Sequence, residues 1–295
     1  MARVNSLRLL AARTAFQGRL AFSEAWAFSY ALRLFTTPGR HAIPPRERLA
    51  MRGARRVDLA LEGDRLATWV WGQSERRVAL LHGWEGRGSQ WHAFIVELRA
   101  AGMQVIVVDP PAHGLSRGWS RADLPLFIKS LFRVEEEFGP ITCVVGHSLG
   151  GTAIVGALEL GLHAERAAII SAPARPRNYW LALLRALGLA ESRIPAFDGR
   201  FADVYGFSWE ELDMVRVASR CTVEALVIHD RWDREVPCDE AALLAEAWRG
   251  ARFHMTDGLG HRRILCDGAV VGAVTRFAAG RTAGDRCFSD VEPCA

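Results

Sequence analysis

A serine between glycines is the first candidate for chemistry in this chain. The motif Gly-His-Ser-Leu-Gly spans Gly146–Gly150, after an apolar run and before a stretch of small residues with helical spacing. A sharp turn from a strand into a helix leaves no room for side chains two positions either side of the serine. It also places the hydroxyl beside the first free N–H groups of the helix. The motif predicts that Ser148 is a nucleophile; the alternative is a glycine-rich turn in which the serine is incidental.

A serine nucleophile needs a base, and the base needs an acid that orients it. Two candidate acids, Asp230 and Asp233, follow the apolar run of residues 223–228. His261 follows a Gly-Leu-Gly loop at the start of the last expected helix, whereas His254 lies within an expected strand. The glycine loop favours His261 as the base and a structural role for His254.

These motifs, in this order, resemble those of the α/β-hydrolase superfamily, in which the chain order is serine, acid, histidine. Residues 229–237 are similar to the family's segment HGxxDxxVP, which implies that Asp233 is the acid. Asp230 stands where that segment has glycine, so an assignment to Asp230 stays open. The resemblance implies a catalytic triad of Ser148, Asp233 and His261. The run of motifs looks like that of bacterial members of the esterase and lipase type whose substrates are unassigned.

Two further loops are similar to segments of the same superfamily. Residues 82–84, His-Gly-Trp, end an apolar run and resemble the family's HGx loop. The resemblance implies that the backbone N–H groups of Trp84 and Leu149 form an oxyanion hole, and we expect a structural hydrogen-bonding role for His82. Residues 109–116 resemble the family's DxxGxGxS segment and are expected to form a turn beside the oxyanion loop.

The elements that must position these residues alternate along the chain. From residue 56 to residue 280, short apolar runs alternate with helical stretches, and such runs fit parallel strands covered on both faces. The pattern predicts an α/β protein with the α/β-hydrolase fold, a mostly parallel, doubly wound sheet. A small helical cap is expected after the sixth strand, at about residues 173–220. The last helix is expected over residues 261–279.

The expected cap is rich in aromatic and aliphatic residues, which favours a hydrophobic acyl or aromatic substrate. The alternative is that these side chains only anchor the cap on the core. The candidate residues of the substrate pocket are His147, Tyr179, Trp180 and Trp232.

The net charge of +4 is unevenly distributed. Residues 1–56 contain eleven arginines and two acidic residues, a charge of +9, so the remainder carries −5. We expect a basic amphipathic helical extension at 1–55, the hydrolase domain at 56–280 and a polar tail at 281–295. The mildly acidic body argues against a nucleic-acid partner. The extension is expected to pack on the hydrolase body, to form a homodimer contact or to lie on an anionic membrane surface; otherwise it is a targeting or disordered segment.

The resemblance implies a serine hydrolase that cleaves a carboxylic ester of a small to medium hydrophobic substrate through an acyl-enzyme. Thioesterases, peptidases and C–C bond hydrolases use the same triad, and a catalytically silent binding protein on this fold is a further alternative. Serine at position 148, rather than a carboxylate, argues against haloalkane dehalogenase and epoxide hydrolase chemistry. No motif indicates a metal or an organic cofactor, so neither is expected. No convincing secretory signal is found, so the expected location is the cytoplasm, with peripheral membrane attachment as the alternative.

Overall fold

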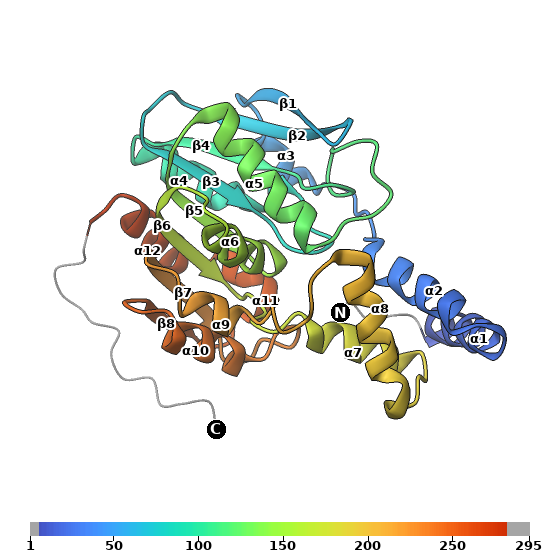
Figure 1. The fold of residues 1–295 in the computed structure, drawn as a ribbon. Coiled ribbons are helices and arrows are strands. Elements are labelled where there is room, and N and C mark those ends of the chain that lie inside the picture. Colours follow the sequence, from blue (N-terminus) through green and yellow to red (C-terminus); the bar gives the residue numbers. More distant parts are fainter. Residues whose placement is uncertain (1–5, 282–295) are drawn as a thin grey trace. The chain divides into compact units, whose positions relative to one another are not determined.

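The computed structural model of the chain describes residues 6–281 (Figure 1). The chain divides into two compact units. The larger comprises Pro38–Ala174 and Met214–Ala295, and the smaller comprises Met1–Thr37 and Arg175–Asp213. The expected polar tail, residues 281–295, lies outside the described residues apart from Arg281. All of the expected hydrolase motifs belong to the larger unit.

One sheet forms the centre of the larger unit. Within the described residues it has eight strands in the order β1-β2-β4-β3-β5-β6-β7-β8. The pairs β1–β2 and β2–β4 are antiparallel and all other pairs are parallel. The strands are β1 Arg55–Leu61, β2 Asp64–Trp71, β3 Arg77–Leu81, β4 Gln104–Val108, β5 Ile141–His147, β6 Ala164–Ile170, β7 Glu224–Asp230 and β8 Arg252–Thr256. Every residue of β5 is buried, as expected for a parallel strand covered on both faces.

Helices cover both faces of this sheet (Figure 1). Apolar side chains of α4 and α12, such as Phe94 and Val274, are buried in one cluster with Leu80 and Val107 of the sheet. The helices of this unit are α3 Pro45–Ala50, α4 His92–Ala100, α5 Leu124–Phe138, α6 Leu149–Glu159, α9 Met214–Ala218, α10 Cys238–Ala247, α11 Gly260–Arg263 and α12 Gly268–Ala278. The predicted mostly parallel, doubly wound sheet is confirmed.

The end of the chain differs from the single helix expected over residues 261–279. The structure has the short helix α11, a 3₁₀ turn at Ile264–Cys266 and then α12. The carboxylate of Asp267 accepts hydrogen bonds from the backbone N–H groups of Ala269 and Val270, both at 3.0 Å. Because an aspartate in this position caps the N-terminus of a helix, a new helix starts here and His261 stays on a separate short turn.

The smaller unit joins the two N-terminal helices to the segment that follows β6. Its helices are α1 Ser6–Phe22, α2 Glu24–Thr36, α7 Arg177–Ala186 and α8 Ile194–Tyr205. Phe16 of α1 and Phe28 of α2 contact Phe197, with ring centroids 6.1 and 5.9 Å apart. Trp180 lies 6.0 Å from Phe28 and is completely buried. The four helices therefore share one aromatic core, built from both segments of this unit.

The unit boundaries differ from the expected ones. The expected extension ran to residue 55, but residues 38–55 belong to the larger unit. The buried carboxylate of Glu47 in α3 gives a physical reason, because it accepts two hydrogen bonds from the guanidinium of Arg87, each at 2.7 Å. Of the helices described within residues 6–281, none combines the length and apolar character that a membrane span requires.

Candidate active site

Ser148 occupies a strained turn between β5 and α6. Its backbone has φ 53° and ψ −128°, a region that residues with a Cβ rarely adopt and that costs about 1–3 kcal/mol. Its N–H donates to the carbonyl of Ile170 on the neighbouring strand at 2.9 Å, which holds the turn to the sheet. Strain of this kind is stored at functional sites, and here it fixes the direction of the hydroxyl.

Two glycines allow the loop after β3 to approach this turn. A Cβ on Gly83 would lie 2.5 Å from the Cβ of Ser148 and 3.1 Å from its Oγ. A Cβ on Gly150 would overlap the carbonyl oxygen of Leu81 at the end of β3. The backbone of the loop after β3 therefore lies against the side chain of Ser148, and any larger residue would push the two elements apart.

Two backbone donors adjoin the serine. Leu149 is the first residue of α6, whose leading N–H groups have no acceptor within the helix. Trp84 follows Gly83 in the loop that lies against Ser148. Within residues 6–281 the N–H groups of Trp84 and Leu149 make no hydrogen bond, so both can donate to a ligand. Backbone donors of this kind can stabilise an oxyanion.

The carboxylate of Asp233 holds the imidazole of His261. His261 Nδ1 lies 2.7 Å from Asp233 Oδ2, and Asp233 Oδ1 accepts from the N–H groups of Glu235 and Val236 at 2.8 and 3.0 Å. Burial alone would raise the pKa of Asp233, but the hydrogen bond and charge of His261 and the two backbone donors hold it below its usual value. An ionised carboxylate at Nδ1 keeps the proton on that nitrogen and leaves Nε2 with a free lone pair.

Asp230 binds other groups. Its Oδ1 accepts from the N–H of Trp232 at 3.0 Å, and its Oδ2 accepts from Thr256 Oγ1 and from the N–H of Leu259, both at 2.8 Å. Burial would raise the pKa of Asp230, but the donated hydrogen bonds, including those from Gly260 and Leu259, lower it below its usual value. Asp230 thus shapes the loop that carries His261, and Asp233 is the carboxylate bonded to His261.

His147, expected to line the substrate pocket, lies beside His261 instead of being free for a ligand. Its Nε2 is 2.8 Å from the carbonyl oxygen of His261, and the two rings are 4.6 Å apart. A carbonyl only accepts, so Nε2 carries the proton and donates. Burial, and next the charge of His261, hold the pKa of His147 well below its usual value, so the ring is neutral. Through this bond the residue before Ser148 fixes the backbone of His261.

His229, for which the sequence predicted no role, lies against Asp233. The side chain is fully buried. Its Nε2 donates to the carbonyl of Val236 at 3.0 Å and lies 3.4 Å from Asp233 Oδ2. Burial lowers the pKa of His229, so the ring is neutral. The sequence signals for this role are its position at the end of an apolar strand and as the first residue of the segment that resembles HGxxDxxVP.

Buried polar groups hold the loop after β3 in place. Asp109 accepts from the N–H groups of Gly88 and Leu115, each at 2.6 Å, and His82 Nε2 lies 3.2 Å from the same carboxylate. His113 Nε2 accepts from the N–H of Glu85 at 3.0 Å, while burial lowers the pKa of His113 to about 3. These groups are engaged with the backbone, which agrees with an architectural role for residues 109–116.

The remaining pocket candidates lie on different parts of the chain. Trp180 is buried in the aromatic core of the smaller unit, which fits the alternative that the aromatic residues anchor the cap. Tyr179 is half-buried on the same helix. Trp232 is 64% exposed, and its Nε1 donates to Asp257 Oδ1 at 2.8 Å. Of these three, Trp232 alone belongs to the unit that holds Ser148.

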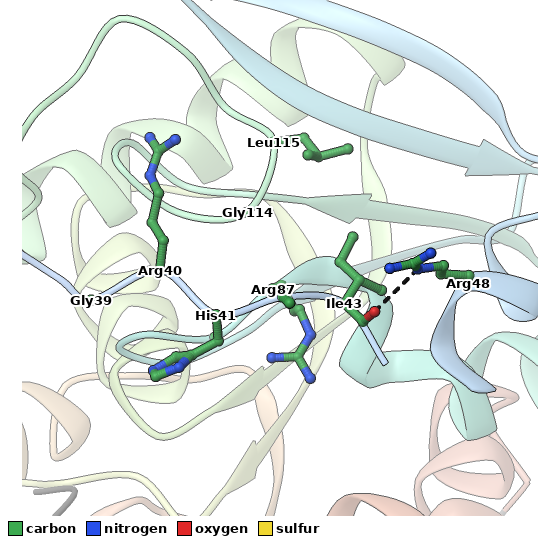
Figure 2. Close-up of a pocket in the computed structure, with 10 residues that line it drawn as sticks. Gly39, Arg40, His41, Ile43, Arg48, Arg87, Gly114 and Leu115 are labelled. Carbon is green, nitrogen blue, oxygen red and sulfur yellow. Dashed lines mark hydrogen bonds between the residues drawn. The ribbon is translucent and has the colours of Figure 1, made fainter. Parts of the chain in front are cut away.

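A basic cavity of about 360 Å³ lies in the larger unit (Figure 2). Figure 2 shows the side chains of Arg40, His41, Arg48 and Arg87 around it. Arg40 donates to the carbonyls of Ala112 and Ser116, both at 3.3 Å, so its guanidinium is bonded to the backbone of residues 109–116. The residues lining the cavity are Gly39, Arg40, His41, Ala42, Ile43, Arg48, Gly86, Arg87, Gly114 and Leu115. None of the predicted triad residues lines it.

Residues 6–281 contain no cluster of three or more His, Cys, Asp or Glu side chains suited to a metal ion.

A strained serine between a parallel strand and a helix, with a carboxylate-bound histidine carried beyond the last strand, defines an α/β-type hydrolase site. The model of the alpha/beta hydrolase family matches residues 78–273, more than half of the chain. The chain belongs to this family. Among curated proteins, none matches it in sequence.

Solved structures with several activities share the fold. A carboxylesterase from Bacillus subtilis is 18% identical, with a TM-score of 0.60, over 80% of this chain and 95% of that one. A thioesterase domain from the curacin biosynthetic pathway is 15% identical, with a TM-score of 0.57, over 77% and 99%. A meta-cleavage product hydrolase from Pseudomonas fluorescens is 16% identical, with a TM-score of 0.55, over 76% and 96%. At these identities the likeness shows the fold alone.

Proposed function

We propose that this hydrolase cleaves a carboxylic ester of a small to medium hydrophobic substrate with Ser148, His261 and Asp233 as its triad. The observation that carries the proposal is the 2.7 Å contact between His261 Nδ1 and Asp233 Oδ2. It fixes the imidazole tautomer in which Nε2 is the base, and it supplies the negative charge that stabilises the imidazolium once a proton is taken.

The reaction proceeds in two halves. His261 Nε2 takes the proton of Ser148 as Oγ attacks the ester carbonyl, and the N–H groups of Trp84 and Leu149 donate to the resulting oxyanion. The imidazolium protonates the leaving alcohol, which departs and leaves an acyl-serine. Water, deprotonated by the same imidazole, then releases the acid. Asp233 stays ionised throughout, in keeping with its lowered pKa.

The same geometry serves thioesters, amides and activated C–C bonds, and solved structures with the fold include a thioesterase and a meta-cleavage product hydrolase. A silent binding protein would have no need of a strained serine beside unpartnered N–H groups, which supports an enzyme. A series of p-nitrophenyl esters of increasing acyl length, with matched acyl thioesters, separates the ester from the thioester hypothesis. Preference for thioesters at every length would contradict the ester assignment.

Covalent labelling tests the nucleophile directly. We expect a fluorophosphonate probe to label the wild-type chain and to leave Ser148→Ala unlabelled, because only an activated hydroxyl attacks phosphorus at a useful rate. Ser171→Ala is the matched control: Ser171 is also buried at the end of a strand with a positive φ of 50°. We expect this variant to label like the wild type. Labelling that survives in Ser148→Ala, with an unchanged circular dichroism spectrum, contradicts the proposal.

A further inference from the structure

Helix α1 exposes an apolar face. Leu7 and Leu10 are 73% and 61% exposed, and Phe22, at the other end of the helix, is 85% exposed. The residues between them on this face recur at intervals of three and four, the spacing of one helix face, and are uncharged and exposed. The face consists of Leu7, Leu10, Ala11, Thr14, Gly18, Ala21 and Phe22.

The opposite side of α1 is apolar as well. Phe16 is completely buried and contacts Phe197 in the core of the smaller unit, and Ala12 and Leu20 pack against the same core. A helix that is apolar on two sides is normally buried on both. The core accounts for one side only, so the exposed face needs a partner of its own.

Charge indicates what that partner is. Arg8, Arg13 and Arg19 lie on the flanks between the two apolar sides, and residues 6–22 contain no acidic residue. The guanidinium of Arg19 lies 4.3 Å from the ring centroid of Tyr30 and 5.9 Å from that of Trp26, which is itself 61% exposed. Apolar side chains bordered by arginines and interfacial aromatics match a bilayer surface, where the chains enter the acyl region and the cations meet phosphates.

A second copy of the chain fits less well. Two α1 faces packed on each other would bring the arginine flanks of both copies together, and no acidic residue of α1 would neutralise them. We propose that the exposed face of α1, with Trp26 beside it, docks the protein on an anionic lipid bilayer. The helix lies in the plane of the interface, since its 17 residues are too few to span the hydrocarbon.

Vesicle flotation of the full chain tests this proposal. We expect the wild type to float with vesicles of phosphatidylcholine and phosphatidylglycerol and much less with phosphatidylcholine alone. The variant Leu7→Ser, Leu10→Ser, Phe22→Ser should partition at least about tenfold more weakly, because three side chains that would leave water are removed. Arg8→Gln with Arg13→Gln should lose the preference for the anionic lipid.

A matched triple variant controls for the loss of exposed apolar side chains in general. Val96, Leu160 and Val204 are 57%, 66% and 58% exposed on other helices or at their ends, and we expect their serine variants to float like the wild type. Ser148→Ala should also float normally, which separates docking from catalysis. Equal flotation of the two triple variants overturns the proposal. So does light scattering that shows a dimer dissolved by the α1 substitutions, without vesicle binding.

Discussion

Two aspartates three residues apart, Asp230 at the end of β7 and Asp233 in the loop after it, have different hydrogen-bond partners. Asp233 binds the Nδ1 of His261 and two backbone N–H groups, whereas Asp230 binds Thr256 and the backbone of the loop before the histidine. The residue type is the same, and both pKa values are lowered by donated hydrogen bonds that outweigh burial. Only the direction of each carboxylate distinguishes the proposed catalytic acid from a group that shapes a loop.

Replacing Asp233 by Asn tests that distinction. An amide at this position either loses its bond to Nδ1–H or favours the imidazole tautomer whose Nε2 carries the proton, so the base has no free lone pair. We expect kcat for the best ester of the acyl series to fall on the order of 10³–10⁴-fold, with little change in KM.

Asp230→Asn is the matched control for this substitution. We expect it to lower the free energy of unfolding by about 1–3 kcal/mol, since a charged acceptor of several hydrogen bonds is weakened. Its kcat should stay within about tenfold of the wild type, because the contact between Asp233 and His261 persists. A larger loss of kcat in Asp230→Asn than in Asp233→Asn would reverse the two roles.

At the scale of elements, the site depends on how closely α6 approaches the end of β3. The loop after β3 lies against Ser148 because Gly83 and Gly150 have no side chains to separate them. This contact places Gly83, the residue before Trp84, and the N-terminus of α6 beside Ser148. A shift of α6 by the width of a methyl group would therefore separate the two proposed oxyanion donors.

Gly150→Ala should disturb both folding and catalysis. The added Cβ would overlap the backbone carbonyl of Leu81, which cannot rotate away as a side chain can. We expect a loss of about 1–3 kcal/mol in the free energy of unfolding and at least a tenfold loss in kcat/KM.

Gly268→Ala provides the comparison. Gly268 is the first residue of α12, and a Cβ there has no atom within 4 Å. We expect this variant to be neutral or more stable by up to about 1 kcal/mol, with unchanged kcat/KM. Urea unfolding and ester turnover measure both effects. Wild-type stability in Gly150→Ala would show that α6 can move without consequence.

For the whole molecule, local sequence patterns predicted the sheet. Packing between segments far apart in the chain could not be predicted from the sequence. Apolar runs such as β5 are buried on both faces, so their composition alone indicates parallel strands. The glycine motif around Ser148 is equally local. By contrast, the shared core of α1, α2, α7 and α8 joins segments far apart in the chain. The sequence of neither segment indicates that it packs against the other. The N-cap at Asp267 did have a local signal, an aspartate before a helical stretch. The prediction of a single helix over residues 261–279 did not take this signal into account.

The orientations of the buried histidines could not be predicted from the sequence either. Together these histidines affect the stability of the whole molecule. His113, His147 and His229 are buried with lowered pKa values. At a pH between its folded-state pKa and its unfolded value of 6.5, such a histidine is neutral in the folded protein and takes up a proton when the protein unfolds. Stability from these groups is therefore fully present above pH 6.5 and is lost as the pH falls.

His113 gives the best-defined case. Its pKa falls from 6.5 to about 3, so it alone should lower the free energy of unfolding by roughly 1.4 kcal/mol per pH unit between these values. Urea unfolding at pH 7.5, 6.0 and 5.0 measures the slope. In His113→Gln, the amide oxygen can still accept from the N–H of Glu85. We expect this variant to be less stable at pH 7.5, but its free energy of unfolding should change less with pH, by roughly 1.4 kcal/mol per pH unit. An unchanged slope would mean that His113 is protonated in the folded protein without cost. That would contradict the neutral tautomer fixed by its bonds to Glu85 and Pro111.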